Sequence, residues 1–244
     1  MTELYNIRAA GRTDVGLVRK ANEDSILMMT EQSFWLVADG MGGHANGAIA
    51  SQTAVSGFKA LQLSEDFEQA ITEIADRVHA VNSRLSHMNV EAESGQMGTT
   101  AISLLIRGDK FAIIWVGDSR AYIYRRGGLF QISVDHTHVQ DLVDEGILNP
   151  DEAKDHPMGH VLTRALGVQE SVQVDVVQDM IEPGDRIILC SDGLTGPVSD
   201  EKIREIVSKN DIEDSVTQLI GQAYEGGAAD NVTVIVVAID GAVS

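Results

Sequence analysis

The sequence is poor in the residues that stabilise secreted or irregular chains. Its 244 residues include one cysteine and four prolines. A single cysteine excludes an internal disulfide and is typical of a reducing compartment. The few prolines, an apolar content of 43% and the lack of a low-complexity linker or internal repeat indicate a globular protein. At this length a large core can form, and we expect residues 1–244 to make a single domain.

Long hydrophobic runs are also lacking. The longest apolar stretches, 111–116 and 232–239, are rich in β-branched residues and far shorter than the roughly 20 residues of a membrane-spanning helix. The first residues, Met1–Tyr5, lack the basic and apolar regions of a signal peptide. We therefore expect a cytoplasmic protein with no direct membrane insertion.

Basic residues are scarce. The chain has 18 Lys and Arg against 37 Asp and Glu, which gives a formal net charge of −19. This charge argues against binding to a nucleic-acid backbone, so no nucleic-acid partner is expected. It favours solubility, and part of the acidic excess is available for metal binding.

Four short acidic signatures each follow an apolar run at a turn. They contain Asp39, Asp118, Asp192 and Asp230. A carboxylate at the rim of a buried sheet is costly unless a cation accompanies it. Asp and Gly also make ordinary turns, so one signature alone carries little weight. Together, the four predict one shared cluster of hard cations.

Ten runs are predicted strands. They cover residues 5–10, 26–29, 34–38, 99–107, 111–116, 121–125, 129–134, 172–177, 186–190 and 232–239. Short polar links join the four middle runs, which predicts an antiparallel meander. The run 111–116 is nearly continuous in apolar residues, which indicates burial on both faces. An α+β fold satisfies both facts, as a four-layer αββα sandwich of two antiparallel sheets flanked by helices.

Helical patterns supply the outer layers. We predict helices over about 47–61, from Ser64 to beyond Leu85, and over 200–207 and 213–224. The segment of about 135–167 has few apolar residues, with a short helical pattern at 139–143 and a second near 151–154. We expect it to form a mobile flap subdomain.

The acidic signatures suit a magnesium or manganese site. Both ions take oxygen ligands, prefer near-octahedral geometry and keep several waters. Asp39, Asp192 and Asp230 fit this need, and Gly40 leaves room for a backbone carbonyl to reach a metal. If Asp39 bridges two ions about 3.5–4 Å apart, the water between them becomes a hydroxide that can attack phosphorus.

An upstream charged hexapeptide offers substrate contacts. Arg19 could orient a phosphate bidentately, and Glu23 or Asp24 could hold metal-bound waters. A solvated charged loop is the better interpretation of this hexapeptide when it is taken alone.

The order of these motifs resembles the bacterial PPM, or PP2C-type, serine/threonine protein phosphatases. The motifs are Arg19-x-x-Asn22-Glu23-Asp24, Ala38-Asp39-Gly40-Met41-Gly42-Gly43-His44, Gly98-Thr99-Thr100, Val116-Gly117-Asp118-Ser119-Arg120, Ser191-Asp192-Gly193-Leu194 and Asp230-Asn231-Val232-Thr233. The resemblance extends from about Ile7 to Ile239, and 135–167 looks like the flap of that family.

The resemblance implies a binuclear centre. Asp39 would bridge both ions, Gly40 would offer its carbonyl to one, and Asp192 and Asp230 would bind the other. Asp118 resembles the ligand of a third, weaker site that is shared with Asp192.

The remaining positions match in the same way. Arg19 matches the phosphate-binding arginine, and Glu23 and Asp24 match residues that act through water. Met41 departs from the animal-type pattern, in which a histidine follows Asp-Gly and is a candidate general acid. His44 is the bacterial-type alternative, although it could equally cap the following helix or contact solvent.

Other reactive residues have simpler interpretations. His136 and His138 form a His-x-His pair, but no third zinc ligand stands at a recognisable spacing, so we interpret them as surface or flap histidines. Cys190 lies inside an apolar run and is interpreted as a core residue. Gly196 stands where the Cys-x5-Arg loop of thiol phosphatases would need arginine.

These interpretations predict a metal-dependent enzyme that hydrolyses phosphoserine and phosphothreonine in proteins and releases inorganic phosphate. Its partners would be phosphoproteins, the products of a Ser/Thr kinase, and its cofactor Mn²⁺ or Mg²⁺. A non-catalytic phosphoprotein-binding module is the main alternative, but it would be expected to lose metal ligands. A cation-binding structural protein would leave Arg19 without a purpose.

Overall fold

Two antiparallel sheets form the centre of the molecule. The structure is a computed structural model that describes residues 5–42, 45–91, 95–154 and 156–241. The first sheet has the order β1 (Tyr5–Asp14), β11 (Val232–Gly241), β10 (Arg186–Cys190), β7 (Arg120–Arg125) and β8 (Gly128–Gln131). The second has the order β2 (Asp24–Met29), β3 (Phe34–Met41), β5 (Ala101–Arg107), β6 (Lys110–Val116) and β9 (Asp175–Met180), and β4 (Gly98–Thr99) also pairs with β3.

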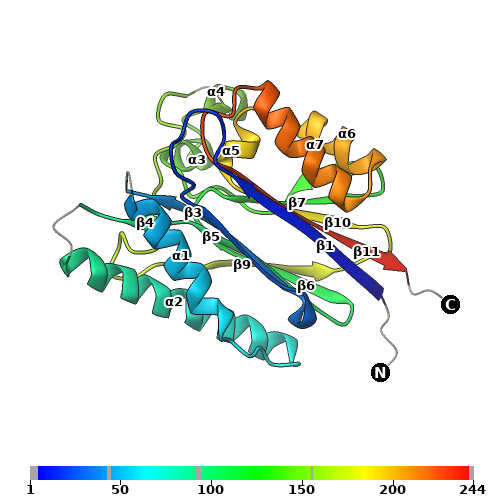
Figure 1. The fold of residues 1–244 in the computed structure, drawn as a ribbon, viewed down its shortest axis with the longest axis horizontal. Helices are drawn as coiled ribbons and strands as arrows, with labels where there is room; N and C mark the ends of the chain where they lie inside the picture. Colours follow the sequence, from blue (N-terminus) through cyan, green and yellow to red (C-terminus); the bar gives the residue numbers. More distant parts are fainter. Residues whose placement is uncertain (1–4, 43–44, 92–94, 155, 242–244) are drawn as a thin grey trace.

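Helices cover both outer faces, as Figure 1 shows. The second sheet is covered by α1 (Ala45–Lys59) and α2 (Phe67–Glu91), and the first by α6 (Asp200–Lys209) and α7 (Ile212–Glu225). The other four helices are short: the 3-10 turn η1 (Thr30–Gln32), α5 (Asp192–Thr195), and the flap pair α3 (His138–Asp144) and α4 (Pro150–Lys154). The predicted αββα sandwich is confirmed.

Three apolar layers hold the sandwich together. The central layer lies between the sheets and contains large side chains with almost no exposed surface, among them Trp35, Ile102, Leu104, Leu189 and Ile235. The other two layers lie under the helix pairs. Strands with a core on each face must be apolar at nearly every position, which explains the continuous runs of β6 and β11.

One sequence prediction about topology is wrong. The middle strands do not form a single meander, because β6 pairs with β5 and β9, whereas β7 pairs with β8 and β10 in the other sheet. The link 117–120 therefore crosses between the sheets. Gly117 has φ +107°, a conformation that favours glycine, and this lets the chain turn sharply from one layer to the next. A short link enforces a hairpin only when both strands share a sheet.

The flap segment has the two predicted short helices. Its ends are anchored, since Leu166 is fully buried and Thr137 makes an isolated bridge with Leu162. Ile147, between the helices, is 63% exposed. The neighbouring strands differ from prediction, because β8 ends at Gln131 and β9 begins only at Asp175. In the described ranges, no helix has the length and apolar character needed to cross a membrane.

Candidate metal centre

The predicted aspartates gather at one end of the sandwich. Asp39 lies near the end of β3 and stands directly opposite Asp24, the first residue of β2. Asp118 lies in the crossing between the sheets, and Asp192 begins α5 immediately after β10. Asp230 precedes β11. Both sheets therefore contribute carboxylates to the same rim, although the residues span most of the sequence.

Asp24 connects the two sheets at this rim. It is 6% exposed, and its Oδ2 accepts hydrogen bonds from Ser191 Oγ at 2.8 Å and Thr233 Oγ1 at 2.6 Å. Ser191 Oγ in turn accepts the Thr233 N–H at 3.1 Å. Asp24 belongs to the second sheet, and both hydroxyls belong to chain segments of the first. Its carboxylate is thus fixed directly beside Asp39.

Burial and neighbouring carboxylates raise the pKa of several of these carboxyls. Burial is the largest cause in each case, because it disfavours the charged form. The pKa of Asp24 rises to about 6 even though the two hydroxyls lower it. That of Asp118 rises to about 7, with further contributions from Asp192 and Asp135. Burial and then the charges of its carboxylate neighbours raise the pKa of Asp39 well above its usual range.

Two glycines make room for oxygen atoms around Asp39. A Cβ on Gly40 would lie 2.0 Å from the carbonyl oxygen of Gly47. A Cβ on Gly47 would lie 2.1 Å from Glu23 Oε2 and 2.7 Å from the Gly40 carbonyl oxygen. A side chain at either position would collide with these atoms. Because Gly47 has none, the Gly40 carbonyl and the Glu23 carboxylate both face the space beside it, next to Asp39.

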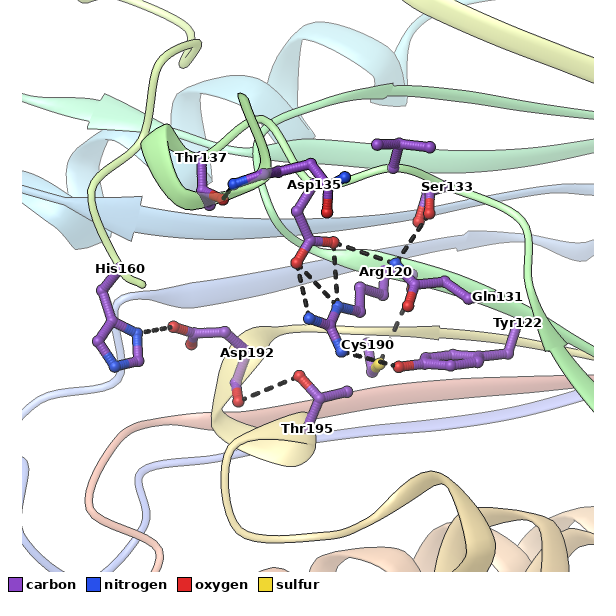
Figure 2. A network of polar contacts seen from close by, with 12 residues as sticks. Arg120, Tyr122, Gln131, Ser133, Asp135, Thr137, His160, Cys190, Asp192 and Thr195 are labelled. Atoms are coloured by element: carbon purple, nitrogen blue, oxygen red, sulfur yellow. Dashed lines mark hydrogen bonds and ion pairs between the residues drawn. The ribbon is translucent and has the colours of Figure 1, made fainter. Parts of the chain in front are cut away.

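An arginine and a histidine approach the carboxylates from outside. Arg19 Nη2 donates to Asp230 Oδ2 at 2.6 Å, while about half of the arginine side chain stays exposed. In the flap, His160 Nδ1 lies 3.5 Å from Asp192 Oδ2, and Figure 2 shows its ring pointing at that carboxylate. The hydrogen bond with Asp192 raises the pKa of His160, because the carboxylate stabilises the imidazolium.

Asn231 holds the loop that carries Arg19 and Glu23. Its Oδ1 accepts the Glu23 N–H at 2.8 Å, and its Nδ2 donates to the carbonyls of Val15 at 2.9 Å and Ala21 at 3.0 Å. The charged hexapeptide is therefore not a free solvated loop. It is fixed against the segment that supplies Asp230.

These residues fit a divalent-cation centre. Several buried carboxyls with raised pKa values repel one another, and a hard cation with oxygen ligands would relieve that repulsion. In the described part of the chain, however, no three His, Cys, Asp or Glu side chains are arranged as a ready site for one ion. Asp230 is engaged by Arg19, so water and the Gly40 carbonyl would have to complete the coordination.

Sequence reasoning missed some of the residues at this centre. Ser191 and Thr233 lie inside the recognised motifs, so their spacing could have indicated them. His160 lies in a polar flap stretch without any such signal. His136 lies in the flap segment, one of the two interpretations given for it, but it is only 4% exposed and so is not a surface histidine, whereas Cys190 is buried as predicted. Gly43 and His44 fall outside the described residues.

Comparison with known proteins decides the family. The sequence model of protein phosphatase 2C matches residues 18–231, which includes every aspartate of the centre. The chain belongs to this family. Serine/threonine phosphatase stp of Listeria monocytogenes is 33% identical over 243 residues, and the match covers 96% of each chain.

The mycobacterial relatives are more similar in sequence and longer. Serine/threonine protein phosphatase PstP of Mycobacterium tuberculosis is 41% identical over 231 residues, 94% of this chain and 44% of that protein. The present chain thus spans less than half the length of that relative.

Solved structures of PstP have the same fold. The crystal structure of Mycobacterium tuberculosis PstP/Ppp superposes with a TM-score of 0.90 at 39% identity, covering 96% of this chain and 99% of that one. The PstP catalytic domain in complex with two manganese ions has a TM-score of 0.86 at 38% identity, covering 96% and 98%.

Proposed function

We propose that this chain hydrolyses phosphoserine and phosphothreonine in proteins and releases inorganic phosphate, with two Mn²⁺ or Mg²⁺ ions as cofactors. The observation that carries the proposal is the proximity of Asp192 and Asp230 to Asp39, with Arg19 paired to Asp230, at the rim of a protein phosphatase 2C fold. When bound, the two ions would supply a hydroxide from a shared water near neutral pH and polarise the phosphoryl oxygens.

The carboxylates divide into two groups in this proposal. Asp39, which both sheets surround with carboxylates, would hold both core ions. Asp192 and Asp230 would hold one of them, and the Gly40 carbonyl would hold the other. The space beside Gly47 supports this second assignment, because both the Gly40 carbonyl oxygen and the Glu23 carboxylate face it.

Three further carboxylates act around the core. Glu23 and Asp24 hold waters of the metal centre, and the buried hydroxyl contacts of Asp24 fix its orientation. Asp118, together with Asp192, serves a third and weaker cation site. The influence of Asp192 on the pKa of Asp118 supports this pairing.

Arg19 binds the substrate phosphate. Its planar guanidinium can donate two parallel hydrogen bonds to phosphate oxygens, which orients the phosphorus relative to the rim. The ion pair with Asp230 aims the exposed arginine across the centre before substrate arrives. His44 remains our candidate for protonating the leaving alkoxide.

The substrates in this proposal are phosphoproteins produced by a Ser/Thr kinase. Residues 1–244 act as a single phosphatase domain, and the flap of about 135–167 governs access and substrate choice. A cavity of about 510 Å³ supports this role, because its lining includes both flap residues, such as Val139 and His160, and the carboxylates Asp118 and Asp192.

Phosphate release from a phosphopeptide, with Mn²⁺ and with chelator, tests the proposal. We expect release with the ion and none with the chelator. Phosphopeptide binding without release would identify a binding module instead. Cation binding with neither would identify a structural protein, and either result would refute the enzyme.

A further inference from the structure

His136 is a buried histidine at the root of the flap, and the metal centre described above does not use it. Its ring stacks on Trp115, with the centroids 5.9 Å apart and the planes inclined by 15°. The Trp115 indole N–H is itself fixed, because it donates to the Val134 carbonyl at 2.9 Å. The imidazole therefore has little freedom to turn.

Two hydrogen bonds join His136 to Gly117. The His136 N–H donates to the Gly117 carbonyl at 3.0 Å, and the Gly117 N–H donates to Nδ1 of His136 at 3.0 Å. A peptide N–H can only donate, so Nδ1 carries no hydrogen and the ring is the neutral Nε2–H tautomer. Burial lowers the pKa of His136, which favours the same neutral form.

The other ring nitrogen fixes the imidazole to the flap and to an edge strand. Nε2 lies 3.2 Å from Oδ2 of Asp175, the first residue of β9. Arg164, near the end of the flap, donates from Nη1 to Asp175 Oδ1 at 3.1 Å, and this nitrogen lies 3.2 Å from Nε2. The ring is thus held from both ends of the flap.

A second contact, an ion pair, lies beside the contact of His136 with Gly117. Arg120 donates to the carboxylate of Asp135 over distances of 2.7 to 3.0 Å, as Figure 2 shows. Asp135 and His136 at the flap root therefore bind the two ends of the link 117–120. Asp118, the proposed ligand of the third cation, lies in the link between these two contacts.

The same link packs against the residue that holds Asp39. A Cβ on Gly117 would lie 2.6 Å from Thr100 Cγ2, so this turn has no spare room. Thr100 Oγ1 accepts the Asp39 N–H at 3.0 Å and shares a hydrogen bond with Ser119 Oγ at 2.8 Å. A shift of the link would therefore disturb the backbone of the bridging aspartate.

We propose that His136 is a positioning residue for the third cation site: its Nδ1 holds the Gly117 peptide and so fixes the direction of the Asp118 carboxylate. The inference rests on the proposed function, which assigns Asp118 to that site. Removing a group that orients a metal ligand lowers metal affinity by about 10- to 100-fold. Without the Nδ1 acceptor, we expect Mn²⁺ binding at the weakest site to fall about tenfold.

Three substitutions separate the two ring nitrogens. His136→Asn keeps an acceptor oxygen at the place of Nδ1, whereas His136→Gln places its amide at Nε2 and leaves Nδ1 unreplaced. His136→Phe keeps the ring and loses both nitrogens. His138→Asn is the matched control, because His138 lies two residues further along the flap root and its side chain takes no part in these contacts.

Two measurements need no substrate: hydrogen exchange of the Gly117 amide in metal-free protein, followed by NMR, and Mn²⁺ binding followed by electron paramagnetic resonance. We expect the Gln and Phe variants to lose about fivefold in Gly117 protection, the factor that one hydrogen bond is worth, and to bind the weakest Mn²⁺ about tenfold less well. The Asn variant and the control should resemble the parent.

Several outcomes would overturn the proposal. Protection kept by Gln and lost by Asn would assign the role to Nε2. Parental behaviour of the Phe variant, with impaired Asn and Gln variants of lower Tm, would show that the ring only fills space. Equal impairment of all three would show that the Nδ1 acceptor alone does not hold Gly117, and parental behaviour of all three would show no role. If the Phe variant does not fold, the Asn–Gln comparison decides. A parent without phosphatase activity would refute the proposed function, while these two measurements would still test His136.

Discussion

Replacing Asp118 with Asn should stabilise the metal-free protein at neutral and alkaline pH. Asp118 is 8% exposed, and burial together with the nearby carboxylates raises its pKa from 3.8 to about 7. Each tenfold change in proton affinity corresponds to about 1.4 kcal/mol. Ionising this carboxyl in the folded chain therefore costs on the order of 4 kcal/mol at pH 8, and Asn removes the charge with little change in shape.

The direction of this pH dependence of stability follows from which state, folded or unfolded, keeps the proton. The unfolded chain releases this proton near pH 3.8, whereas the folded chain holds it until about pH 7. Stability is thus unaffected below the unfolded pKa, falls as pH rises through this window, and levels off above it. The cost of the carboxyl grows from about 2 kcal/mol at pH 5 to about 4 kcal/mol at pH 8.

Thermal unfolding in chelator, from pH 5 to pH 8, measures this cost. The difference in stability between Asp118→Asn and the parent should grow by about 2 kcal/mol over the range, or roughly 4–8 °C in Tm for a chain of this size. Taking the difference between the two proteins removes other titrations, such as that of buried His136, whose lowered pKa acts in the opposite direction.

The exposed Asp76, on α2, provides the control. Asp76→Asn should leave the Tm difference independent of pH. A gap between Asp118→Asn and the parent that stays constant or narrows from pH 5 to pH 8 would refute the reasoning, because it would show that the protein already compensates the charge of Asp118. In saturating Mn²⁺ the parent should become the more stable of the two proteins, since it alone keeps this carboxylate for the cation.

Three further predictions concern turnover. Asp39→Ala or Asp192→Ala should abolish phosphate release from a phosphopeptide with an unchanged circular dichroism spectrum, since each is assigned to a core ion; release at the parental rate would contradict this. Asp118→Ala should lower activity and lose one of three Mn²⁺ in soaked crystals, and loss of the other two would show the ligands to be misassigned. Leu142→Ala or Ile147→Ala should slow hydrolysis of phosphoproteins more than of p-nitrophenyl phosphate; equal loss with a lower Tm would indicate a packing role for the flap.

Local periodicity predicted the elements because burial imposes it directly. The stripe along α2, which includes Ile74, Val78, Val81 and Leu85, lies buried against the second sheet. Pairing between strands is not local in the same way. The link 117–120 looks like a hairpin in sequence, and only the left-handed backbone of Gly117 and the packing of two sheets show that it crosses between layers.

The site was predictable where chemistry requires a residue type at a strand end. Asp39, Asp192 and Asp230 stand after or before apolar runs, so their gathering followed from the fold. The contact of His160 with Asp192 did not, because the flap path that brings them together leaves no periodic signal. The burial of His136 was not predicted for a related reason: its partners Gly117 and Asp175 are distant in sequence.

The position of Asp24 connects the stability of this fold with its chemistry. A carboxyl buried between two sheets costs free energy, and its raised pKa reflects that cost. Yet it receives hydroxyl hydrogen bonds from Ser191 and Thr233, which belong to the sheet opposite its own. These bonds align the rim segments that carry Asp192 and Asp230 with the one that carries Asp39. The same carboxylates that weaken the metal-free fold are thereby placed where a shared cation would neutralise them.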